Sequence, residues 1–232
     1  MYQDAKQLAA QRAVELVSSG MCVGLGTGST ASLFIAELGK AIADGRLTGI
    51  TGVPTSVQSE QIANQFGVPL ADLSEGFTCD LTIDGADEID PHLELIKGLG
   101  GALLREKVVA QNSKRVVIIA DASKRVARLG TKCPLPVEVI PFARYTTEKF
   151  LREQGFKPAL RLDAHGKPFV TDNDNVIFDC AIDHVHDTRQ LARDLSARAG
   201  VVAHGLFIGI ADLAIVADQG QQVDVLSRMQ CG

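Results

Sequence analysis

The sequence contains no tryptophan and only two tyrosines, and none of its hydrophobic stretches is long enough to span a bilayer. Its five cysteines are widely spaced and odd in number, and the lack of any CxxC pair argues against a zinc ribbon or a dithiol redox motif. We therefore expect buried thiols in a reducing compartment and a cytoplasmic protein with no membrane partner. The first residues also lack the basic start of a signal peptide.

Basic residues are scattered along the chain and the net charge is −5, which argues against the basic patch or stripe of a nucleic-acid-binding protein. What the sequence does have is a large apolar fraction, 46% of 232 residues, together with 22 glycines. This composition supports a substantial core and argues against disorder. The length suits one large domain, or one domain with a small second lobe.

Short apolar runs alternate with helical patterns in the first half of the chain. The expected strands are 21–25, 50–53, 80–84 and 115–120. The expected helices are 4–18 with an Asp4 cap, one through Phe34 to Leu38, one from Ser56, and 102–110. Strands that are apolar without a two-residue period are typical of a parallel sheet with helices on both faces. The pattern therefore predicts an α/β fold with a Rossmann-like, mostly parallel sheet.

The pattern changes after Gly130, where prolines punctuate the chain. The expected elements are a strand at 137–140, helices at 145–154 and 188–198, a hairpin of 169–171 and 176–180, and a strand at 201–203 that pairs back. We predict a small α+β, ferredoxin-like lobe over 130–205. The larger Rossmann-like domain then comprises 1–129 and 206–232.

The first candidate site is the glycine loop Gly24–Ala31, which follows the first strand. A glycine turn before a helix offers backbone N–H groups and a positive dipole end to an anion, and Ser29 and Thr30 add hydroxyl groups. An ordinary tight turn with a helix cap is the alternative. The loop fits the dinucleotide-binding pattern G-x-G-x-x-A, but residues 53–56, at the end of the next strand, offer no acid to bind a ribose hydroxyl. A nucleotide-binding P-loop is also excluded, because no lysine follows the glycines. A small phosphate ester is therefore the better ligand.

Four carboxylates, Asp84, Asp87, Glu88 and Asp90, lie within seven residues directly after the third strand. Ligands of open α/β sheets bind at the carboxyl ends of strands, so this position suits a ligand site. Crowded carboxylates repel one another, which suits proton transfer. A solvated acidic turn and a divalent-metal site are the alternatives. The spacing does not match an EF-hand, because Ala86 occupies a ligand position.

Two further segments bring lysines to possible ligand sites. The run Lys97-Gly98-Leu99-Gly100-Gly101 precedes a helix that carries Glu106, so N–H groups, a cation and a carboxylate can face one crevice. Lys124 follows the clearest strand and is placed to meet a phosphate. Taken alone, Glu106 is more simply explained as a surface glutamate and Lys124 as a surface lysine. His184 and His186 have no metal-binding spacing, and we interpret both as incidental.

The ordered set GLGTGSTA, DGADEID, KGLGGALLREK and ADASK resembles the ribose-5-phosphate isomerase family, type A. PLPVEVIPFA and TDNDNVIFD are similar to the family's next segments, so the resemblance covers nearly the whole chain. It implies an aldose–ketose isomerase that interconverts ribose 5-phosphate and ribulose 5-phosphate through an enediolate, in the non-oxidative pentose phosphate pathway. It also implies that no cofactor or metal is needed, and that the protein is a homodimer or homotetramer.

The resemblance implies roles for individual residues. Glu106 matches the catalytic base. Asp84, Asp87 and Lys97 match catalytic residues at the sugar oxygens, and either aspartate can serve ring opening. The expected substrate contacts are Lys6, Thr27, Gly28, Ser29, Thr30, Asp84, Gly85, Ala86, Asp87, Lys97, Gly98, Leu99, Gly100 and Lys124.

Two other classes of protein compete with this interpretation. A non-catalytic phosphosugar sensor can keep the glycine loop, but it does not need Glu106 beside the acids and Lys97. An acyl-CoA transferase can share the sheet and use a catalytic glutamate. Turnover of ribose 5-phosphate in EDTA, or an enzyme-bound thioester, distinguishes these alternatives.

Overall fold

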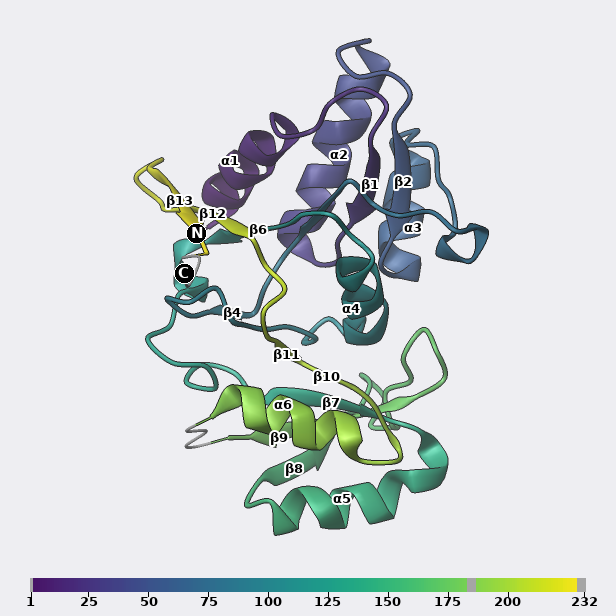
Figure 1. Ribbon diagram of the computed structural model, residues 1–232, viewed down its shortest axis with the longest axis vertical. Coiled ribbons are helices and arrows are strands. Elements are labelled where there is room, and N and C mark those ends of the chain that lie inside the picture. Colours follow the sequence, from purple (N-terminus) through teal and green to yellow (C-terminus); the bar gives the residue numbers. More distant parts are fainter. Residues whose placement is uncertain (1, 183–186, 229–232) are drawn as a thin grey trace. The chain divides into compact units, whose positions relative to one another are not determined.

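Short apolar strands build a six-stranded sheet in the first of the two units into which the chain divides (Figure 1). The structure is a computed structural model that describes residues 2–182 and 187–228. The first unit comprises Met1–Ala86, Arg105–Lys124 and Gly209–Gly232. Its strands are β1 (Cys22–Leu25), β2 (Thr51–Pro54), β3 (Leu81–Asp84), β6 (Val116–Asp121), β12 (Leu213–Ala217) and β13 (Val223–Ser227).

The strand order of this sheet creates a site for a ligand. The order is β13-β12-β6-β3-β1-β2, and every neighbouring pair is parallel except β12 and β13. The predicted mostly parallel sheet is thereby confirmed. The chain runs outward from β1 to β2 and then returns to β3 on the other side of β1. Such a reversal opens a crevice at the carboxyl ends of the two inner strands. The ends of β1 and β3 are therefore where a ligand is expected.

Helices cover both faces of the sheet. They are α1 (Gln3–Val14), α2 (Ser29–Ala43), α3 (Val57–Gln65) and α4 (Leu103–Gln111), with 3-10 turns η1 (Leu73–Glu75) and η2 (Ala122–Lys124). In α2, Phe34, Ile35 and Leu38 recur at helical spacing and are buried with α1 against the strands. On the opposite face, Val109 of α4 packs with Val53 of β2.

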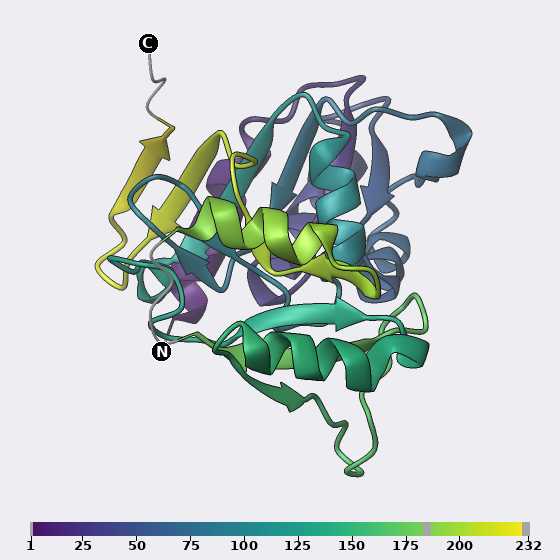
Figure 2. The same ribbon diagram turned by 60° about the horizontal axis from the view of Figure 1, so that its bottom comes forward.

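The second unit comprises Asp87–Leu104 and Arg125–Ile208 and contains a β-α-β-β-α-β lobe (Figure 2). The lobe is built from β7 (Leu135–Val139), η3 (Pro141–Ala143), α5 (Arg144–Glu153), β8 (Lys157–Leu160), β9 (Val176–Ala181), α6 (Thr188–Ala197) and β10 (Val201–His204). The antiparallel sheet has the order β10-β7-β9-β8, which confirms the ferredoxin-like prediction. Leu151 of α5 and Leu195 of α6 pack against Val137 and Phe178 on one face.

The two units of the structure differ from the two predicted domains, whose boundaries stay a prediction. The predicted boundaries assign 87–104 to the larger domain, whereas the structure groups these residues with the second unit. The physical reason is a small sheet in which β5 (Leu95–Ile96) pairs with both β4 (Glu88–Ile89) and β11 (Leu206–Phe207). These pairings join the segment after β3 to the end of the lobe.

Two local predictions were wrong. The first helix ends at Val14 rather than near residue 18, and Asp4 lies in its first turn without capping it. The hairpin of 169–171 and 176–180 does not form, because residues 169–171 are not a strand and β9 pairs with β7 and β8 instead. The sequence analysis missed β8, an edge strand that contains a proline.

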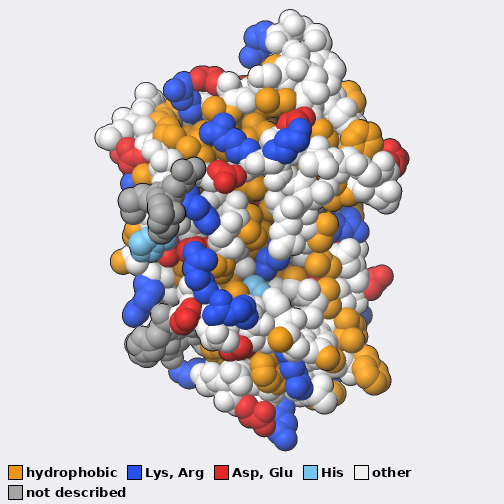
Figure 3. Space-filling view, in the orientation of Figure 1, with side chains coloured by type: hydrophobic (Ala, Val, Ile, Leu, Met, Phe, Trp, Pro, Cys, Tyr) orange, Lys and Arg blue, Asp and Glu red, His pale blue; other side chains and the backbone are white. Residues whose placement is uncertain are grey.

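The cysteines of the described residues are free thiols with unequal burial. Cys79 and Cys180 are buried, as expected, whereas Cys22 and Cys133 are only half-buried and Cys231 lies outside the described residues. Burial raises the pKa of the Cys79 and Cys180 thiols to about 12. No helix in the described part of the chain has the length and apolarity needed to cross a membrane. Figure 3 shows basic and acidic side chains interspersed on the face it presents.

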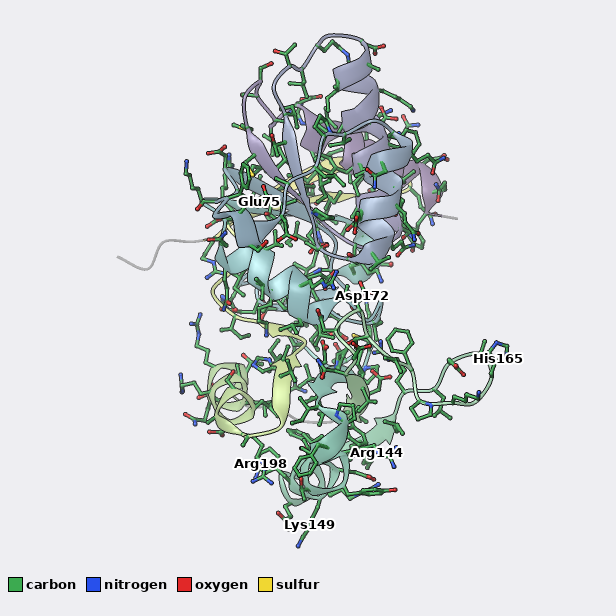
Figure 4. The ribbon with its side chains drawn as sticks, turned by 90° about the vertical axis from the view of Figure 1, so that its right-hand side faces the viewer. Glu75, Arg144, Lys149, His165, Asp172 and Arg198 are labelled. Carbon is green, nitrogen blue, oxygen red and sulfur yellow. The ribbon has the colours of Figure 1, made fainter. Side chains whose placement is uncertain are left out.

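The packing of α5 can be tested with one buried and one exposed residue of that helix. Leu151 is fully buried, whereas Lys149 exposes 79% of its side chain (Figure 4). Leu151→Ala is expected to lower the free energy of unfolding by about 2–5 kcal/mol, because lost apolar transfer and a residual cavity add. The control Lys149→Ala is expected to change it by less than about 0.5 kcal/mol. Urea unfolding measures both, and equal effects would contradict this packing.

Candidate active site

Hydrogen bonds to Asp84 tie together the ends of β1 and β3. The Thr27 N–H and the Gly85 N–H donate to Asp84 Oδ1 at 3.0 and 2.7 Å. Gly26 makes this approach possible, since a Cβ at that position would lie 2.2 Å from Asp84 Oδ1. Asp84 itself is 1% exposed. Its carboxylate is therefore held at the carboxyl ends of β1 and β3, where the strand order reverses.

The Thr27 hydroxyl makes hydrogen bonds at the end of β2. Thr27 Oγ1 lies 2.8 Å from both Thr55 Oγ1 and Ser56 Oγ, and Thr55 in turn donates to the Leu25 carbonyl. Thr55 and Ser56 are buried and brace the glycine loop, and the sequence analysis missed this role. The signal was present in the sequence, because two hydroxyl residues stand at the strand end where a dinucleotide-binding fold places an acid.

The remainder of the glycine loop begins α2 and brings Lys6 to it. Ser29 is the first residue of α2, and its Oγ accepts a hydrogen bond from Lys6 Nζ at 3.0 Å. Lys6 lies on α1, which packs beside α2. Gly28 precedes α2 as its N-cap, and Thr30 is buried in its first turn. A helix N-terminus with an adjacent ammonium group is suited to hold an anion.

Glu106 lies on α4 near the same strand ends. Ser113, two residues after the end of α4, forms a β-bridge with Cys79, which lies just before β3. Helix α4 therefore ends at the amino edge of the sheet and begins at its carboxyl edge. Val109 packs over Gly24 of β1, where a Cβ would lie 2.8 Å from Val109 Cγ1. Glu106 is one turn earlier on that face, about 4.5 Å nearer the carboxyl edge. Its side chain is buried, with the residue 4% exposed.

Lys124 is carried to the same edge by a short turn. It ends η2, which directly follows β6, the neighbour of β3 in the sheet. Asp121 is buried and accepts hydrogen bonds from the Ser123 N–H, at 3.0 Å, and from the Ser123 hydroxyl. These bonds close the turn. Within the described residues, no hydrogen bond joins Lys124 to another predicted site residue.

The second unit holds the predicted residues Asp87 and 97–100 around a glycine turn, whereas Ala86 belongs to the first unit. The Leu99 N–H donates to Asp87 Oδ2 at 2.9 Å. Lys97 is 3% exposed, and its Nζ lies 5.4 Å from the centroid of the Phe207 ring. Its backbone N–H donates to the Gly205 carbonyl. An aromatic face stabilises a nearby cation. The turn thus presents a fixed carboxylate and a fixed ammonium group from the same unit.

The acidic segment after β3 does not form one cluster. Glu88 is fully buried and accepts backbone N–H groups from the loop at 130–133. Asp90 accepts N–H groups from its own turn. The solvated acidic turn is therefore wrong. Across the ranges that the structure describes, no three His, Cys, Asp or Glu side chains are grouped so that they can hold a metal ion. His184 and His186 lie outside those ranges.

Comparisons with known proteins agree on one family. The model of a family described as Ribose 5-phosphate isomerase A (phosphoriboisomerase A) matches residues 51–221. The chain is 52% identical over 212 residues to ribose-5-phosphate isomerase A of Roseiflexus castenholzii, with 91% of each chain covered. It matches the solved ribose 5-phosphate isomerase A of Methanocaldococcus jannaschii with a TM-score of 0.93 and 40% identity over 98% of this chain and 100% of that chain. A D-ribose-5-phosphate isomerase in complex with phospho-erythronic acid matches with a TM-score of 0.94 and 37% identity over 97% and 98% of the chains.

The residue beside Glu106 gives a prediction about pH. Burial lowers the pKa of the Lys107 ammonium from 10.5 to about 7. The folded state therefore binds this proton less tightly than the unfolded chain, so Lys107 destabilises the fold most below pH 7 and progressively less between pH 7 and 10.5. Lys107→Met is expected to raise the Tm more at about pH 6 than at about pH 9, with Lys149→Met as the exposed control. A gain independent of pH would contradict the burial of this charge.

Proposed function

The chain belongs to the ribose 5-phosphate isomerase A family, and from that premise we propose that it interconverts D-ribose 5-phosphate and D-ribulose 5-phosphate. It is accordingly an aldose–ketose isomerase of the non-oxidative pentose phosphate pathway. The observation that carries the proposal is the fixed Asp84 carboxylate beneath the glycine loop, with buried Glu106 on the helix that covers the same strand ends. The reaction needs both an anion site and a group that transfers a proton from carbon.

The phosphate is proposed to bind at the N-terminus of α2. Ser29 and Thr30 begin this helix, and Lys6 Nζ already lies 3.0 Å from Ser29 Oγ. Lys124 adds a second cation from the end of β6. The phosphate is remote from the carbons that react, so its binding energy serves to hold those carbons against the catalytic groups.

Glu106 is the proposed base. It removes the proton from C2 of the aldose, the C–H electron pair becomes the C1–C2 double bond, and the carbonyl oxygen takes the negative charge. Glu106 then returns the proton at C1, with the electron pair of the C1–C2 double bond forming the new C–H bond. The C2 hydroxyl passes its proton to the negatively charged C1 oxygen, and the C2–O bond becomes the ketone carbonyl. Lys97 and the N–H groups of Gly98 and Gly100 are proposed to stabilise the enediolate oxygens. The burial of Lys97 supports this role, because electrostatic interactions weaken less where water is excluded.

Asp84 and Asp87 are proposed to contact the sugar hydroxyl groups and to open the furanose ring. Ring opening requires that the ring oxygen gain a proton and that the anomeric hydroxyl lose one. Each aspartate is held by a backbone N–H, from Thr27 and from Leu99 respectively. Fixed carboxylates suit this work, because proton transfer depends on the distance between donor and acceptor.

The ligand named for the solved relative is a suitable probe. Phospho-erythronic acid combines a phosphate with a carboxylate on a four-carbon chain. It therefore resembles a sugar phosphate whose reacting end carries negative charge, as an enediolate does. We propose that it binds this chain in the substrate's place, because compounds that resemble a charged intermediate bind more tightly than the substrate.

The remaining expectations rest on the family resemblance. We propose that the protein works in the cytoplasm as a homodimer or homotetramer, without a cofactor or metal. Its partner is a small phosphosugar, and neither a nucleic acid nor a membrane is proposed. Turnover of ribose 5-phosphate in the presence of EDTA would support this proposal over the phosphosugar sensor and the acyl-CoA transferase.

Replacement of the proposed base tests the mechanism directly. Glu106→Gln keeps the shape of the side chain but cannot accept the C2 proton, so turnover of ribose 5-phosphate is expected to fall by at least about 10²-fold. Binding of phospho-erythronic acid, measured by calorimetry, is expected to stay within a few-fold of the unchanged protein. Glu60→Gln, an exposed residue of α3, is the matched control. Near-normal turnover of Glu106→Gln would remove Glu106 from its role.

The intermediate can be tested by isotope exchange. An enediolate exposes the transferred proton to the base and to water, so solvent deuterium is expected at C1 of ribulose 5-phosphate formed in deuterium oxide. Mass spectrometry of the product measures the incorporation. Complete retention of the original hydrogen would indicate a direct hydride shift and would contradict the proton-transfer mechanism.

A further inference from the structure

Arg161 connects the lobe sheet to the glycine turn of the same unit. It lies directly after β8, and its Nε and Nη2 donate to Asp179 Oδ2 and Oδ1 at 2.9 and 2.5 Å. Its Nη1 donates to the carbonyl oxygens of Gly98 and Leu99, both at 3.0 Å. The Arg161 side chain is 12% exposed. One guanidinium group thus links a carboxylate of β9 to two consecutive carbonyls of the turn that follows Lys97.

These two bonds determine where the N–H groups of the turn point. A trans peptide directs its N–H opposite to its carbonyl. The Leu99 N–H shares a peptide with the Gly98 carbonyl, so it points away from Arg161 and reaches Asp87 Oδ2 at 2.9 Å. The Gly100 N–H shares a peptide with the Leu99 carbonyl and also points away from Arg161. Among the described residues no acceptor meets it, which leaves it available to a ligand.

A second side chain supports the same turn from the loop between β8 and β9. The ring of Phe169 packs directly on Gly101, where φ is +85° and a Cβ would lie 2.6 Å from a ring atom. The Arg161 guanidinium lies 5.8 Å from the centroid of that ring. Beyond Phe169, buried Glu138 accepts the Thr171 hydroxyl at 2.8 Å and anchors the loop to β7. The lobe therefore fixes the turn at both ends.

We propose that Arg161 is a positioning residue of the isomerase site, which orients the Leu99 N–H toward Asp87 and the Gly100 N–H toward the sugar oxygens. The inference rests on the proposed function, in which this turn contacts the substrate. Arg161 itself touches carbonyls and a carboxylate. Its planar, forked guanidinium makes four hydrogen bonds in different directions at once, which an ammonium group cannot do.

Arg161→Lys tests the geometry while it keeps the charge. Loss of the fork is expected to lower kcat/KM for ribose 5-phosphate by about 10- to 100-fold, since a small misplacement of groups at the site has an effect of that size. The affinity for phospho-erythronic acid is expected to fall in parallel. The affinity for inorganic phosphate is expected to stay unchanged, because the proposed phosphate site lies in the first unit. Arg152→Lys is the matched control, an exposed arginine that pairs with Glu148 on α5.

Two readouts separate positioning from a purely structural role. A structural role would reduce only the active fraction, which active-site titration measures, and would leave KM and the affinity for phospho-erythronic acid unchanged. Asp179→Asn, which keeps Arg161 but weakens its bidentate partner, is expected to give a smaller loss in the same direction. If Arg161→Lys fails to fold, this variant decides the question.

The outcomes also distinguish this inference from the proposed function. Suppose that the unchanged protein and Arg152→Lys isomerise ribose 5-phosphate. If Arg161→Lys and Asp179→Asn then have the same kcat/KM and the same affinity for phospho-erythronic acid, the positioning role of Arg161 is overturned. If the unchanged protein does not isomerise ribose 5-phosphate, the proposed function itself fails. A parallel loss of kcat/KM and of phospho-erythronic acid affinity, with phosphate affinity retained, supports the inference.

Discussion

The first unit depends on the carboxylate of Asp84, which accepts N–H groups from both Thr27 and Gly85. β1 and β3 pair directly, but the chain departs from them in opposite directions, so the loops that follow the two strands are held together by this shared carboxylate. Gly26 makes the contact sterically possible. The positions of the glycine loop and of the first turn of α2 follow from it. A charged acceptor suits this place, because hydrogen bonds to ionised groups are stronger than those between neutral groups.

The second unit meets a similar requirement with a cation. Its glycine turn lies outside helices and strands, so its carbonyls need partners that regular structure does not supply. Arg161 provides them from the position directly after β8, and Asp179 fixes the plane of the guanidinium. In both units, a buried charged side chain orders backbone N–H groups that the family resemblance assigns to the substrate. In each unit, the directions of these backbone groups are set by a side chain distant in the sequence.

The sequence predicted most of the elements that give the fold its class. Apolar runs at β1 and β6 and the helical spacing in α2 are local properties, so they survive in the folded protein. The edge strand β8 was missed because its alternation is interrupted by a proline and only part of it is buried. The bracing roles of Thr55 and Arg161 were missed because their partners lie 28 and 63 residues away in the chain.

By itself the sequence determined the order of strands and helices along the chain, the glycine turns before α2 and α4, and the motif set that resembles one family. Only the tertiary structure decided which members of the acidic segment face the crevice. Asp84 and Glu88 are alike in chemistry and four residues apart, yet one ties two strand ends together and the other orders the loop at 130–133. Their neighbours in space differ because strand pairing brings Asp84 to the Thr27 N–H and Glu88 to the N–H groups of the loop at 130–133.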